Sequence, residues 1–104
     1  MDILDRLQSW YASHCDGDWE HGFGIRISTL DNPGWRLTVN LEETSLEHAT
    51  FERQEIERTD TDWFRCWVKD KHFEAAGGAF NLKEMLGVFI EWAESNPGDK
   101  RNLD

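Results

Sequence analysis

The stretch that decides the fold is FGIRISTLDNPGWRLTVNL, residues 23–41. Apolar residues or threonine occupy every odd position from 23 to 29, which is the period of a half-buried strand. Residues 35–41 return with the same alternation. Between them, Pro33 fixes φ at the first central position of a turn and Gly34 permits a positive φ at the second. We therefore expect a β-hairpin with a type II turn on residues 32–35.

Helical periodicity begins and ends the chain. A first helix is predicted to start at Asp2, a good N-cap, and to end near Cys15, before the turn residues Asp16-Gly17-Asp18. A second helix is predicted to start at Asn81, which has an acid three residues later in capping-box spacing, and to stop at Asn96-Pro97-Gly98. Both helices carry an apolar stripe, so both are expected to pack on other elements.

The segment between the hairpin and the last helix predicts further strands. Residues 51–59 carry many charges and few large apolar side chains, as edge strands do. Residues 63–69 alternate strongly, and the sequence allows a short fifth strand around Phe73. Strands linked by hairpins form antiparallel sheets. We predict an α+β fold, in which the N- and C-terminal helices pack on one face of an antiparallel sheet of four or five strands. We expect residues 1–98 to form one domain and residues 99–104 to be a frayed tail.

The charge balance narrows the possible partners. The 104 residues hold 21 Asp and Glu against 11 Lys and Arg, a formal net charge of −10. Such a chain repels nucleic-acid backbones and anionic membranes, and it complements a basic protein. Two cysteines and the lack of a signal sequence or a long apolar run indicate a cytoplasmic protein.

The densest polar cluster invites a metal-site interpretation. It comprises His14, Cys15, Asp16, Asp18, Glu20 and His21. The first acids have calcium-loop spacing, but His21 replaces the glycine and Ile27 replaces the bidentate acid that such a loop needs. The other interpretation is an acidic turn whose Asp side chains cap backbone amides. The sequence contains no nucleophile elbow and no phosphate-binding loop, so we expect no catalytic residues, no metal and no cofactor. The alternative is a small metal-dependent enzyme that uses this cluster.

The tryptophans and the acids suggest a binding surface. Trp63 and Trp67 are predicted on the sheet face opposite the helices, where they form either a contact patch or a surface covered by loops or long charged side chains. Trp19 and Trp35 flank two turns and are expected to be exposed beside acids. The candidate contact residues for a basic protein are Asp16, Asp18, Trp19, Glu20, Trp35, Glu42, Glu43, Glu47, Glu55, Glu57, Trp63 and Trp67.

The order of rare residues resembles a known family. Trp10-Tyr11, the run Cys15–His21, the run Thr29–Trp35, Asp62-Trp63 with Cys66, and the closing helix with Trp92 are similar to the bacterial immunity protein 53 family. The resemblance implies a cytoplasmic antitoxin of a polymorphic toxin system that binds and blocks a cognate toxin domain. Many such toxins are nucleases, whose basic clefts an acidic inhibitor fits.

The resemblance carries no toxin-contact residues over to this chain. A monomer or weak homodimer is expected, because exposed aromatic patches also serve as dimer contacts. A general acidic interaction module, unrelated to toxins, is the remaining alternative.

Overall fold

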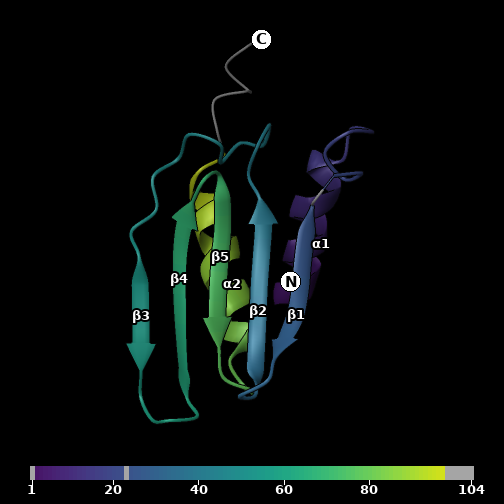
Figure 1. Cartoon of the computed structure of the whole chain (residues 1–104). Coiled ribbons are helices and arrows are strands. Elements are labelled where there is room, and N and C mark those ends of the chain that lie inside the picture. The colour runs from purple at the N-terminus through teal and green to yellow at the C-terminus, as the bar shows by residue number, and fades with distance from the viewer. Residues whose placement is uncertain (1, 23, 98–104) are drawn as a thin grey trace.

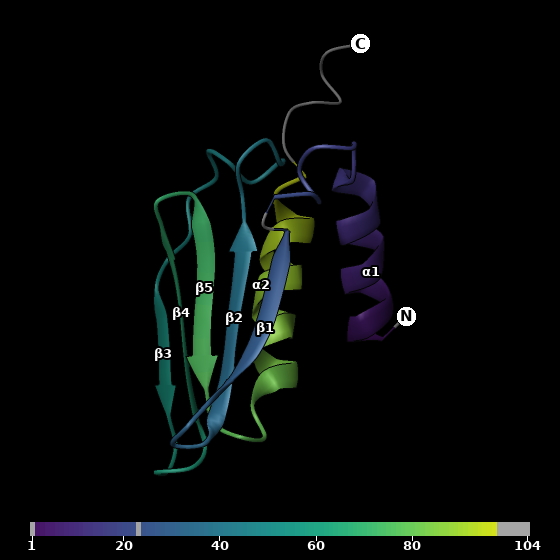
Figure 2. The same cartoon turned by 45° about the vertical axis from the view of Figure 1, so that its right-hand side comes forward.

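Over the residues that the structure describes, the sheet has five strands and both helices lie on one side of it (Figures 1 and 2). The computed structural model describes residues 2–22 and 24–97. Phe23 of the expected first strand and the expected tail at 99–104 lie outside the described residues. The elements are α1 (Ile3–His14), β1 (Ile25–Leu30), β2 (Gly34–Asn40), β3 (Gln54–Glu57), β4 (Trp63–Lys69), β5 (His72–Gly77) and α2 (Leu82–Ser95). The predicted α+β fold is confirmed.

The strand order is β1-β2-β5-β4-β3, with every neighbouring pair antiparallel. The predicted fifth strand is therefore the centre of the sheet. Its inward residues are Phe73, Ala75 and Gly77, all buried. A side chain at Gly77 would come within 2.7 Å of Met85 Sδ, so a small residue lets α2 lie close to this strand. The charged segment β3 forms the edge, as predicted.

The first hairpin forms, but its predicted turn is wrong. Leu30 pairs with Gly34, so residues 31–33 make the connection and Gly34 is the first residue of β2. The φ of Gly34 is not positive, although a type II turn requires a positive φ at this position. The glycine serves a close approach, because a Cβ at this position would collide with the carbonyl oxygen of Gly77 on β5. By contrast, Asp70 and Lys71 between β4 and β5 have φ of 53° and 63°, which a two-residue type I′ hairpin requires.

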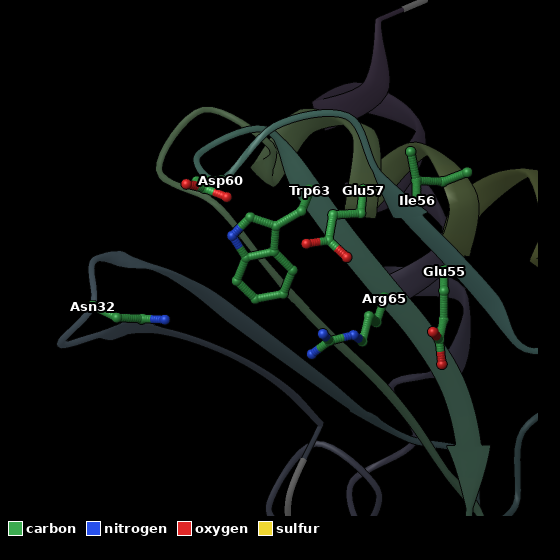
Figure 3. Close-up of a pocket in the computed structure, with 7 residues that line it drawn as sticks. All are labelled: Asn32, Glu55, Ile56, Glu57, Asp60, Trp63 and Arg65. Atoms are coloured by element: carbon green, nitrogen blue, oxygen red, sulfur yellow. The ribbon is translucent and has the colours of Figure 1, made fainter.

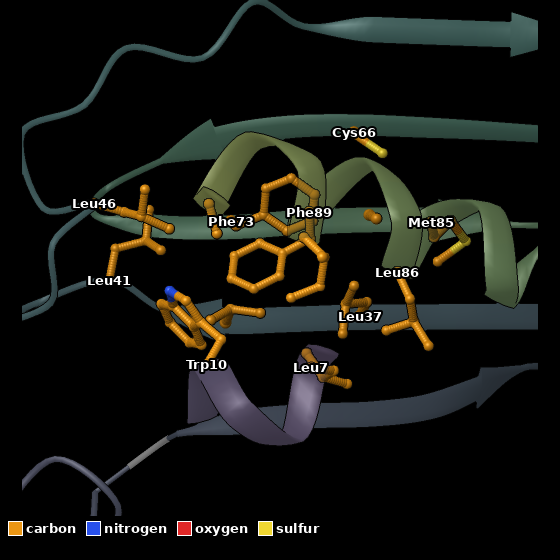
Figure 4. Packing of buried hydrophobic residues seen from close by; sticks show 14 of the residues in the cluster. Leu7, Trp10, Leu37, Leu41, Leu46, Cys66, Phe73, Met85, Leu86 and Phe89 are labelled. Carbon is orange, nitrogen blue, oxygen red and sulfur yellow. The ribbon is translucent and has the colours of Figure 1, made fainter. Parts of the chain in front are cut away.

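The core lies between the sheet and α2 (Figure 4). Phe89 is fully buried, and its ring packs edge-on against Trp10 of α1 with centroids 5.0 Å apart. Leu7 and Trp10 hold α1 against the flank of α2. Leu46, from the connection between β2 and β3, is also fully buried, so this polar segment supplies part of the core.

Within residues 2–22 and 24–97, no helix lies on the other face of the sheet (Figure 2). We call it the outer face. The end with the connections 31–33, 58–62 and 78–81 is drawn at the bottom of Figure 1 and is called the lower end. The end with residues 15–22 and 41–53 is the upper end.

Candidate functional site

A hollow of about 490 Å³ opens at the lower end of the outer face (Figure 3). The antiparallel register places Glu57 of β3 opposite Trp63 of β4, and Glu55 opposite Arg65. These four side chains therefore all project from the outer face. The residues that line the hollow are Asn32, Glu55, Ile56, Glu57, Asp60, Trp63 and Arg65.

An indole and a guanidinium lie together in the hollow. The guanidinium carbon of Arg65 is 5.2 Å from the ring centroid of Trp63, a cation–π contact. Glu57 and Asp60 are exposed beside this pair. The hollow thus combines a half-buried aromatic ring with carboxylates that are open to a partner, which suits recognition of cationic side chains.

Asn81 fixes the wall of the hollow. Its side chain is almost fully buried, and its Nδ2 donates to Asp62 Oδ1 at 2.9 Å and to Glu84 Oε1 at 2.8 Å. Its Oδ1 accepts the backbone N–H of Trp63 at 3.3 Å. The predicted helix start at Asn81 is confirmed. The predicted capping box is wrong, because the Asn81 side-chain oxygen accepts the N–H of Trp63 and no N–H of α2.

Arg58 completes this network. It donates to Asp62 Oδ2 at 3.1 Å and to both oxygens of Glu84 at 2.7 Å. The pKa of Asp62 is lowered mainly by the hydrogen bond from Asn81, and further by the bond from Arg58. The pKa of Glu84 is lowered mainly by its bonds from Arg58, and further by the bond from Asn81. Both carboxyls therefore stay ionised at neutral pH and hold the β3–β4 connection against the start of α2.

Phe80 is a feature that sequence reasoning missed. It is 96% exposed, on the connection between β5 and α2 at the lower end. The backbone around it is tied down: the N–H of Gly78 donates to Trp63 O at 2.9 Å, and Trp35 Nε1 donates to Ala79 O at 2.9 Å. A lone aromatic residue between a Gly-Gly break and a helix start was the only signal in the sequence.

The candidate contact residues divide into separate groups. Glu55, Glu57 and Trp63 come together in the hollow. Trp67 lies further along the outer face, half-buried, with Arg36 and Arg53 over its ring at 5.6 and 5.4 Å. The predicted placement of both indoles opposite the helices is confirmed, and arginine side chains do partly cover Trp67.

The expected exposure of Trp19 is wrong. This side chain is 4% exposed, and its Nε1 donates to Asn40 O at 3.0 Å. Its ring packs against Trp10 at 5.7 Å and Tyr11 at 5.6 Å, so it closes the upper end of the core. Trp35 is half-buried and packs against the core from the helix side of the sheet.

The remaining acids lie at the upper end, away from the hollow. Asp16 accepts the N–H groups of Asp18 and Trp19, and these bonds lower its pKa. Glu20 accepts the N–H groups of Asp16 and Gly17 at 2.9 and 2.7 Å. Its pKa is lowered by the backbone N–H groups of Glu20 itself, Asp16 and Gly17. The acidic turn thus caps backbone amides, as its structural interpretation predicted.

The other acids of this end come from the connection after β2. Glu42 and Glu43 are exposed there. Glu47 pairs with Lys71 at 3.1 Å, which lowers the pKa of Glu47.

Within residues 2–22 and 24–97, no three His, Cys, Asp or Glu side chains come close enough together to hold a metal ion. His14, from the suspected cluster, instead hydrogen-bonds Trp10 O through Nδ1 at 2.9 Å. Cys66 is buried among core residues, and burial raises the pKa of its thiol to about 12, as expected for an unreactive thiol.

Over the part of the chain that the structure describes, no helix has the length and apolar character needed to cross a membrane.

Three comparisons with known proteins bear on the identity of the chain. No curated protein and no solved structure matches the sequence significantly. The family model described as immunity protein 53 matches residues 4–94 of the 104. The chain belongs to the immunity protein 53 family.

Proposed function

We propose that this immunity protein neutralises its toxin by covering a basic active site, such as that of a nuclease, with the lower end of its outer face. On this proposal it catalyses no reaction and acts in the cytoplasm of the producing bacterium. Family membership supports the immunity role. The observation that carries the choice of surface is the hollow, where carboxylates surround the half-buried ring of Trp63.

The lower end has the composition of an interface centre. Aromatic side chains are enriched in the fully buried core of protein interfaces, and a rim of polar groups commonly surrounds this core. Trp63 and Phe80 supply the aromatic area, and Glu57 and Asp60 supply exposed charge beside it. Asn81 and Arg58 hold this surface in place before binding, so little conformational entropy is lost in the complex.

Electrostatic steering favours a basic partner. A net charge of −10 attracts a cationic cleft at long range, and salt screens this attraction. The association rate is therefore expected to fall as ionic strength rises. Inhibition would follow because a bound protein surface excludes substrate from the cleft.

The double substitution Glu57→Gln with Asp60→Asn tests this surface. It removes two charges at the hollow and is expected to slow association with the toxin about three- to tenfold at low ionic strength. The probe is the toxin domain encoded by the gene expected immediately upstream, and stopped-flow or surface-based kinetics give the rate.

The matched control is Glu42→Gln with Glu43→Gln, which removes the same charge from exposed acids at the upper end. This control is expected to slow association less than the hollow variant. Equal effects from the two double variants would leave only net charge as the cause, and a larger effect from the control would move the contact to the upper end.

A further inference from the structure

The outer face departs from the charge of the rest of the chain. The protein carries a net charge of −10, yet five cationic side chains project from or over this one face. They are Arg26, Arg36, Arg53, Arg65 and Lys69. The carboxylates on this face are Glu55, Glu57 and Glu74 of the strands and Asp60 at the hollow, so five cations face four anions.

Neighbouring strands bring most of these cations to the middle and the upper part of the face, above the hollow. Arg36 of β2 and Arg53 before β3 both approach the ring of Trp67 on β4. Arg36 pairs with Glu74, and Arg53 pairs with Glu55 at 2.6 Å, so each guanidinium is held in position. Lys69 is exposed two residues beyond Trp67 on the same side of β4. We call Arg36, Arg53, Trp67 and Lys69 the cationic strip.

A strip of this kind has a chemical preference. Arginine and tryptophan are, with tyrosine, the residues enriched at the energetic centres of protein interfaces. An arginine positioned by an acid and an aromatic ring still offers N–H donors to a carboxylate. Half of the Arg53 side chain is open to solvent, at 56% exposure. A cationic face on a strongly acidic protein also gives the molecule a charge asymmetry that orients an approaching partner.

We infer that the cationic strip receives an acidic patch of the same toxin whose basic site the hollow covers. This inference rests on the proposed function and extends it, since it gives the toxin two contacts of opposite sign. A protein carboxylate patch is the occupant that charge complementarity favours, because the net charge of −10 repels the continuous phosphate charge of a nucleic acid.

The substitution Lys69→Glu, compared with Lys83→Glu, tests the inference. Each replaces one exposed lysine by an acid and changes the net charge equally, but Lys83 lies on α2, on the opposite side of the sheet. If only net charge mattered, both variants would bind a basic toxin faster than wild type. The cationic strip instead predicts that Lys69→Glu binds about three- to tenfold more slowly than wild type, whereas Lys83→Glu does not.

Arg53→Gln is a second variant, and it is expected to increase the dissociation rate of the toxin complex. Circular dichroism melts establish that each variant is folded. The inference is overturned if wild type binds the toxin and Lys69→Glu and Arg53→Gln both bind it as well as wild type does. It is also overturned if wild type binds poly-uridine RNA, Lys69→Glu abolishes that binding, and toxin binding is unchanged. A wild-type chain that fails to bind the toxin at all would contradict the proposed function itself.

Discussion

Replacing Phe80 with alanine is expected to weaken the toxin complex about 10- to 100-fold, as removal of an exposed aromatic anchor does in other interfaces. The side chain is 96% exposed, so it contributes almost nothing to packing in the free protein. The free energy of unfolding should therefore stay unchanged. Titration calorimetry with the toxin domain, together with urea unfolding of the free chain, measures the two quantities separately.

Leu4→Ala is the control for this change. Leu4 is also a large apolar residue, 60% exposed, but it lies on α1, on the helix side of the sheet. Its removal is expected to leave toxin affinity unaltered. Equal affinity of Phe80→Ala and wild type would show that the β5–α2 connection is outside the interface.

The second large effect is on folding. Gly34→Ala places a methyl group against the carbonyl oxygen of Gly77 in the central strand, and neither backbone can move without disturbing the β2–β5 pairing. We expect a loss of about 2–4 kcal/mol in the free energy of unfolding, in the range of severe steric changes within a packed region. Urea denaturation measures this loss as a lower midpoint.

Gly87→Ala is its natural comparison. Gly87 lies inside α2, and an added Cβ would lie 3.8 Å from Ile3 Cδ1 of the neighbouring helix, an ordinary contact. Alanine loses less chain entropy than glycine in a helix, so this variant should gain roughly 0.5–1 kcal/mol. A Gly34→Ala variant as stable as wild type would mean that β2 and β5 do not approach as described.

Periodicity predicts much of this fold because most elements follow local rules. The hairpin from Ile25 to Asn40, both helices and the two faces of β4 all follow from the spacing of apolar residues. The central position of β5 does not, because only Phe73 in that strand is large and apolar. The strand order depends on small residues such as Gly77, which allow close contact with distant segments.

The candidate site was predictable only where alternation places side chains. Glu55, Glu57 and Trp63 are found because residues of an antiparallel pair share a face. Trp19 was misassigned because its burial depends on Asn40 and on the rings of α1, which no local pattern reports. Phe80 was missed because its exposure depends on hydrogen bonds that tie its connection to Trp63 and Trp35, which no local sequence pattern reports.

Hydrogen–deuterium exchange of the chain, with and without the toxin domain, tests the central claim most directly. Backbone amides at residues 54–65 and 79–81 are expected to gain protection in the complex, because they form the hollow and the connection that carries Phe80. Residues 15–22 and 41–47 at the upper end should exchange as they do in the free protein. Protection confined to residues 15–22 and 41–47, with the lower end unchanged, would contradict the claim that the toxin is held at the hollow.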